Sequence, residues 1–194
     1  MRNKQESLRR EYQAYQDRDL QLDMTRGKPS PEQLALSDRL LTIRSTRAAD
    51  GTDCRNYGGL VGLPEARDLF GEYLGVPSTE VIVGGNSSLA LMYDLVMQCR
   101  VRGLWDRRLH RREPVQQKFI CPVPGYDRHF TICERLGIEM IPVAMNNNGP
   151  DMSAVLKLVK DPTVAGIWCV PMYSNPTGVT YSDSVVEQLA SMKC

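Results

Sequence analysis

Asn175 is the residue whose type and position most clearly suggest chemistry. It stands in the run Ser174-Asn175-Pro176-Thr177-Gly178, which follows the apolar stretch 164–170. Pro176 fixes its own φ and favours extended backbone at Asn175, and Gly178 relieves the turn that follows. A strand that ends in this way aims the Asn175 amide at the carboxyl edge of a sheet, where open α/β sheets bind ligands. The same residues also form ordinary turns without a ligand, so other segments must decide.

A second segment that could bind a ligand is Gly84-Gly85-Asn86-Ser87-Ser88, between the apolar residues 81–83 and a predicted helix. Glycines allow close approach of the backbone, and the free N–H groups at a helix start favour an anion such as phosphate. Hydroxyls of Ser87 and Ser88 would add donors. The alternative is a simple helix N-cap, which these residues form with no ligand bound.

Tyr126 is the third candidate, in the run Cys121-Pro122-Val123-Pro124-Gly125-Tyr126. Its two prolines stiffen a turn that would hold the aromatic ring at the edge of the sheet. The alternative is an ordinary loop tyrosine. The two histidines, His110 and His129, are too isolated in the sequence to indicate a catalytic triad or a metal site.

The positioning elements are predicted from alternating apolar runs and helical periodicities. Helices of this length between strands imply right-handed crossovers, and hence an α/β fold with a mostly parallel sheet and helices on both faces. Upstream, a loosely amphipathic helix is expected within residues 1–20, Ser30 and Pro31 predict a short helix start, and residues 63–70 have helical spacing. The expected strands are 81–83, 119–121, 138–143 and 164–170, and the helices between and after them are 87–99, 127–136, 152–159 and 182–193.

Composition excludes several classes of function. The 194 residues are 42% hydrophobic, and 24 basic against 23 acidic residues leave a net charge of +1, which gives no general attraction to nucleic acid or to a membrane. The basic run 100–112 lacks interleaved aromatics and is interpreted as a solvated loop. Six cysteines without paired spacing are interpreted as buried free thiols, and no leader or spanning segment is found, so a reducing cytoplasm is expected.

In combination, these motifs resemble fold-type I pyridoxal-phosphate enzymes, in particular class I/II aminotransferases. The segments Leu22-Asp23-Met24-Thr25-Arg26-Gly27-Lys28-Pro29 and Arg55-Asn56-Tyr57-Gly58-Gly59-Leu60 are similar to the bacterial aspartate aminotransferase branch sometimes labelled MocR-like. The resemblance implies a pyridoxal 5'-phosphate cofactor, with Asn175 donating to its phenolic oxygen and Tyr126 stacking on its ring. It also places the cofactor phosphate at Asn86, Ser87 and Ser88.

The resemblance implies further roles upstream. Tyr57 would reach the cofactor phosphate of a partner subunit in a homodimer, and Gly27 and Arg26 would lie at the substrate carboxylates. It implies an amino acid, aspartate or glutamate, and a 2-oxo acid as substrates, and no metal. It divides the chain into residues 1–50, an arm and substrate-closing segment, and residues 51–194, the first part of a cofactor-binding large domain.

The resemblance also has a gap. The family's Schiff-base lysine, the aspartate at the pyridine nitrogen, a further tyrosine and the carboxylate-binding arginine match no residue here. We therefore expect the N-terminal part of an aminotransferase, inactive by itself. The alternatives are another fold-type I activity such as a β-lyase or decarboxylase, a non-catalytic cofactor-binding remnant, and an unrelated phosphate-binding α/β protein.

Overall fold

The chain forms two compact units, residues 1–65 and residues 66–194. The computed structural model describes residues 2–22, 27–102 and 116–192. The basic run 100–112 therefore lies mainly outside the described residues. None of the described helices is both long enough and apolar enough to cross a lipid bilayer.

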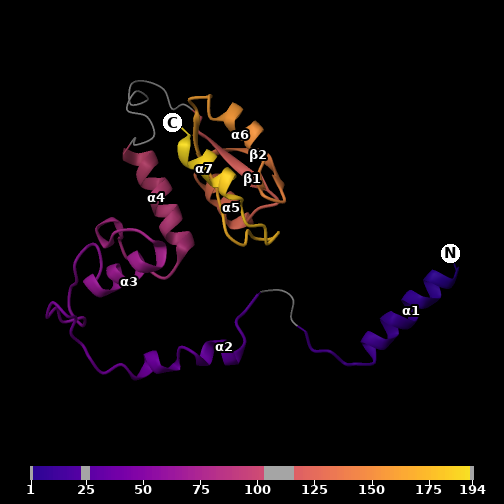
Figure 1. Cartoon of the computed structure of the whole chain (residues 1–194), viewed down its shortest axis with the longest axis horizontal. Helices are drawn as coiled ribbons and strands as arrows, with labels where there is room; N and C mark the ends of the chain where they lie inside the picture. Colours follow the sequence, from indigo (N-terminus) through magenta and orange to yellow (C-terminus); the bar gives the residue numbers. More distant parts are fainter. Residues whose placement is uncertain (1, 23–26, 103–115, 193–194) are drawn as a thin grey trace. The chain divides into compact units, whose positions relative to one another are not determined.

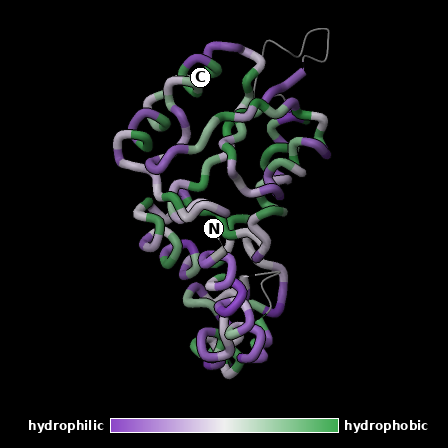
Figure 2. The backbone as a smooth tube through the Cα atoms, turned by 90° about the vertical axis from the view of Figure 1, so that its right-hand side faces the viewer, coloured by the Kyte–Doolittle hydropathy of each residue, from purple (hydrophilic) through white to green (hydrophobic). Residues whose placement is uncertain are grey.

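The first unit consists of short helices joined by extended chain, and none of its described side chains is buried. The predicted helix within residues 1–20 is confirmed, and it is predominantly hydrophilic along its length (Figure 2). The predicted start at Ser30 is also confirmed, because Ser30 and Gln33 form a reciprocal capping box. The helices are α1 (Arg2–Gln16), α2 (Pro31–Ala35) and the 3₁₀ helix η1 (Asp38–Thr42).

The second unit contains a four-stranded sheet with the order β3-β2-β1-β4, covered by helices (Figure 1). Strand β1 is parallel to both β2 and β4, and the short β3 is antiparallel to β2. The expected mostly parallel sheet is therefore confirmed. In chain order the elements are α3 (Pro64–Leu74), η2 (Ser78–Glu80), α4 (Ser88–Arg102), β1 (Lys118–Val123), α5 (Asp127–Arg135), β2 (Glu139–Asn146), β3 (Gly149–Pro150), α6 (Met152–Leu158), β4 (Val164–Ile167) and α7 (Asp183–Ser191).

Two hydrophobic clusters lie on opposite faces of the sheet, because successive residues of β1 point to opposite sides. Phe119 and Cys121 pack with residues of α4 and α5, whereas Ile120 packs with residues of α6 and α7. Helices thus cover both faces, as the sequence predicts for a doubly wound α/β unit. Gly166 of β4 leaves room for the Phe119 ring, since a Cβ at that position would lie 2.5 Å from it.

Three expectations were wrong in part. Residues 81–83 do not form a strand, because no described strand pairs with them; the Arg67 guanidinium donates to the carbonyl oxygen of Val81 instead. The strand expected over 164–170 ends at Ile167, and the short β3 is an additional strand that the sequence did not predict. The cysteines are not uniformly buried: Cys121 and Cys133 are buried and Cys99 and Cys169 half-buried, Cys54 is exposed, and Cys194 lies outside the described residues.

Candidate functional site

The candidate site is an open cavity of about 590 Å³ in the second unit. Its walls come from the start of α4, the start of α5 and the segment after β4. Strand β1 connects through α5 to β2 on one side, while β4 lies on its other side, so the strand order reverses between β1 and β4. Parallel α/β sheets bind ligands at such a switch point, beyond the carboxyl ends of the strands. The lining residues are Ser88, Met92, Tyr126, His129, Cys169, Val170, Pro171, Met172 and Asn175.

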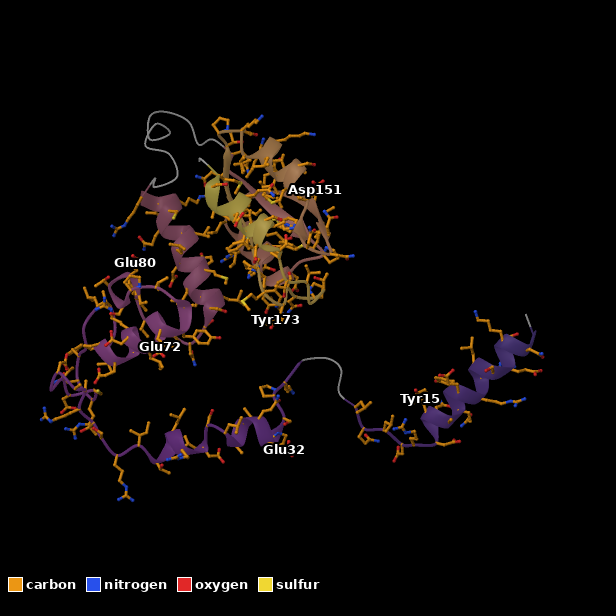
Figure 3. All side chains as sticks on the ribbon, in the orientation of Figure 1. Tyr15, Glu32, Glu72, Glu80, Asp151 and Tyr173 are labelled. Carbon is orange, nitrogen blue, oxygen red and sulfur yellow. The ribbon has the colours of Figure 1, made fainter. Side chains whose placement is uncertain are left out.

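The segment carrying Asn175 is held by backbone hydrogen bonds on both sides of it. The Ser174 N–H donates to the Val179 carbonyl oxygen at 2.8 Å, and the Tyr181 N–H donates to the Pro171 carbonyl oxygen at 2.8 Å. Ser174 is buried, so it anchors the exposed Asn175 beside it. Figure 3 shows Tyr173 on this loop, well separated from Asp151 at the start of α6.

The start of α4 is both a capped helix start and part of the cavity wall, which are the two interpretations that the sequence allowed. The Ser87 hydroxyl accepts a hydrogen bond from the Ala90 N–H at 3.3 Å, which makes Ser87 a helix cap. Ser88 is the first helical residue and lines the cavity. The positive end of the α4 dipole therefore lies at the cavity wall, where it favours a negatively charged group.

An aromatic cluster forms another part of the wall. The Tyr126 ring meets the His129 ring edge-on at a centroid distance of 5.2 Å. His129 also stacks on Trp168 at a centroid distance of 4.8 Å with an interplanar angle of 18°. Tyr126 is the N-cap residue of α5 and His129 lies one turn further on, so both rings line the cavity from one helix start.

The described residues that line the cavity carry no charged side chain at pH 7. Neither a carboxylate nor a lysine or arginine is among them. Burial lowers the pKa of His129 below its usual range and raises the pKa of the Cys169 thiol to about 11. Both groups are therefore neutral at pH 7. Within residues 2–22, 27–102 and 116–192, no cluster of three or more potential metal-binding side chains was found.

The cavity brings together one residue from each of the three predicted motifs: Ser88, Tyr126 and Asn175. Asn86 and Ser87 adjoin the cavity in the chain but do not line it. Tyr57 is fully exposed. The other two candidates lie in the first unit: Gly27 has open space where a side chain would begin, and Arg26 lies outside the described residues.

Sequence reasoning missed His129 as a lining residue. It belongs to no histidine cluster in the sequence, yet its spacing of three residues from Tyr126 at a predicted helix start is a usable signal. Trp168 was also missed as a neighbour of the site. No local signal could have found it, because the fold alone brings the end of β4 against α5.

Comparisons with known proteins give a consistent result. The family model described as aspartate amino-transferase matches residues 2–194. A protein of Corynebacterium glutamicum named aspartate aminotransferase is 47% identical over 191 residues, covering 97% of this chain and 44% of the relative. A protein of Mycolicibacterium smegmatis, named as a candidate aminotransferase, is 50% identical over 194 residues, covering 96% of this chain and 45% of the relative.

A solved structure is also similar. The crystal structure of an aspartate transaminase from Corynebacterium glutamicum superposes with a TM-score of 0.83 at 46% identity, covering 97% of this chain and 45% of that one. The chain thus spans less than half the length of the curated relatives that it matches.

Proposed function

Because the chain belongs to the aspartate aminotransferase family, we propose that it forms part of a pyridoxal-phosphate-dependent aminotransferase. The enzyme would transfer an amino group between an amino acid, aspartate or glutamate, and a 2-oxo acid. The observation that carries the proposal is the shared cavity of Ser88, Tyr126 and Asn175, since three separate motifs supply its walls. We further propose the bacterial MocR-like branch, on the residues 22–29 and 55–60.

The cavity suits pyridoxal phosphate by size and by chemistry. Its volume of about 590 Å³ lies within the roughly 300–1,000 Å³ of small-molecule sites. It combines an aromatic ring, an amide and a helix start, and its lining residues include no carboxylate to repel a phosphate. When bound, this cofactor supplies an electron sink that makes the Cα–H bond of an amino acid labile.

The residues of the cavity then have distinct roles. The Asn175 amide would donate to the phenolic oxygen, and the Tyr126 ring would cover one face of the pyridine. Ser88 and the N–H groups at the start of α4 would hold the phosphate, with Asn86 and Ser87 adjoining it. The apolar side chains of Met92 and Met172 would help exclude water.

The remaining roles concern the whole enzyme. We propose a homodimer in which Tyr57 reaches the phosphate of the partner subunit's cofactor, and Gly27 and Arg26 lie at the substrate carboxylates. Residues 1–50 would form the arm and closing segment, and residues 51–194 the first part of the large domain. Transamination also requires a lysine that bonds to the cofactor, and no lysine of these residues is assigned to that role, so they alone would be inactive.

The decisive experiment is a titration of the protein, in its full natural length, with pyridoxal phosphate. Asn175→Ala should weaken binding roughly tenfold to a hundredfold, because a hydrogen bond to a charged group is lost. Asn147→Ala is the matched control, since Asn147 is exposed on the turn between β2 and β3. Equal affinity of both variants would contradict the proposal for Asn175.

The substrates require a separate assay. Aspartate or glutamate, mixed with the loaded protein and a 2-oxo acid, should yield the corresponding new amino acid and oxo acid. Release of carbon dioxide or elimination of a β-substituent instead would indicate a decarboxylase or a β-lyase. Cofactor binding with no turnover of any amino acid would indicate a binding protein.

A further inference from the structure

A row of four aromatic rings in contact, two of them buried and two half-buried, connects the sheet interior with the candidate site. Phe119 of β1 contacts Trp168 at a centroid distance of 5.4 Å, Trp168 stacks on His129 at 4.8 Å, and His129 meets Tyr126 at 5.2 Å. The last two residues line the cavity, whereas Phe119 belongs to the hydrophobic cluster under α4 and α5. Trp168 is therefore the member of the stack that links the core to the cavity wall.

Trp168 is fixed at two places. Its indole Nε1–H donates to the Cys133 sulfur of α5 at 3.2 Å, and Gly166 leaves space for the Phe119 ring that supports it. Cys133 is fully buried. The pKa of Cys133 is lowered by its neighbour Cys121 and by the Trp168 N–H, because both favour the thiolate form.

His129 depends on this arrangement for its orientation. It is buried, no hydrogen bond from its imidazole is found to the described residues, and its ring contacts are with Tyr126 and Trp168. A change in the Trp168 ring would therefore move His129 and, through it, Tyr126.

We propose that Trp168, held by Cys133, is a positioning residue that sets the His129 and Tyr126 rings in the wall of the cofactor cavity. The inference rests on the proposed function for its ligand. It assigns Trp168 no contact with the cofactor and no step in the reaction. Its effect is on the shape of the cavity before the ligand arrives.

Two measurements on the full-length protein test this proposal. The first is the position of the Tyr126 ring C–H resonances without ligand, because the Tyr126 ring contacts His129 and these resonances therefore report where the His129 ring lies. The second is the dissociation constant for pyridoxal phosphate. Trp168→Leu should shift these resonances and weaken binding about fivefold to tenfold, the size of one lost aromatic pair.

A matched control separates positioning from general destabilisation. Val155→Ala removes volume at a fully buried site in the cluster on the opposite face of the sheet. It should lower thermal stability, yet leave the Tyr126 resonances and the affinity unchanged. The proposal is overturned if Trp168→Leu leaves the resonances in place, or if Val155→Ala weakens binding as much as Trp168→Leu does.

A conservative variant keeps the test valid if Trp168→Leu does not fold. Trp168→Phe retains a ring to stack on His129 and lacks the indole donor, so it should restore most of the affinity. Cys133→Ala should weaken binding in the wild type and have little further effect in Trp168→Phe. Equal losses in the two backgrounds would count against the proposed hold by Cys133.

Failure of the proposed cofactor assignment would give a different result from failure of the proposed role of Trp168. A wild-type protein that does not bind pyridoxal phosphate would contradict the cofactor assignment. In that case the Tyr126 resonances in Trp168→Leu and Val155→Ala still decide whether Trp168 positions the cavity wall.

Discussion

At the scale of single residues, the imidazole of His129 is buried in contact with two rings, and burial lowers its pKa below the usual 6.5. The unfolded chain therefore binds a proton more readily than the folded chain. The free energy of unfolding should rise with pH between the lowered pKa and about 6.5, and the His129 contribution should be complete above that range.

Two measurements check this prediction. The His129 C–H resonances should titrate with a midpoint below 6.5, and urea unfolding at pH 7 should give a higher stability than at pH 5. In His129→Gln, the part of the pH dependence that falls in this window should disappear. A midpoint at or above 6.5 would show that the ring is solvated or paired with an acid.

His129 also shows which features of the site could not be predicted from the sequence. Asn175, Tyr126 and Ser88 were predicted because local turn chemistry and helix starts place them at strand ends, and the structure brings these three into one cavity. The stacking of Trp168 on His129 depends on tertiary packing, which one sequence does not encode in any local pattern.

At the scale of elements, the start of α4 combines two functions in neighbouring hydroxyls. Ser87 caps the helix, and Ser88 lines the cavity. Ser87→Ala should destabilise the protein by about 0.5–1 kcal/mol, whereas Ser87→Gly should cost only a few tenths, because glycine is itself tolerated at an N-cap.

The same pair of variants shows whether Ser87 also donates to the cofactor. Both lack the hydroxyl, so both should lose affinity for pyridoxal phosphate equally if that hydroxyl is a phosphate donor. Thermal unfolding and cofactor titration of the two variants provide the comparison. An affinity loss that instead follows stability would restrict Ser87 to capping.

A helix or a strand could be predicted where its own residues show a helical or a strand periodicity. The helices α4 to α7 and strands β1, β2 and β4 have their own periodicity and turn signals, and all were expected, although β4 ends at Ile167 and not at residue 170. Residues 81–83 have an apolar strand pattern, but a strand also requires a hydrogen-bonding partner, which the described chain does not provide. Strand β3 has two residues, too few for any pattern.

At the scale of the whole molecule, the two units differ in how their residues are stabilised. The first unit buries none of its described side chains, and α1 carries exposed Leu8 and Tyr12, so little within that unit fixes its helices. The second unit has two hydrophobic clusters on a shared sheet. A doubly wound fold was predictable for it because alternating strands and helices permit few arrangements.

Strand β1 has a consequence for how the second unit opens to solvent. It is bonded to β2 on one edge and to β4 on the other, and its residues 119–121 contribute to both clusters. Deuterium should therefore enter these amides last, at a rate set by global unfolding of the unit, while the loop 171–178 exchanges early through local opening. Mass spectrometry of exchanging peptides would show this order, and earlier labelling of 119–121 than of 164–167 would contradict it. The slowest amides of β1 would then report the stability of the whole unit, independently of events in the loops around the cavity.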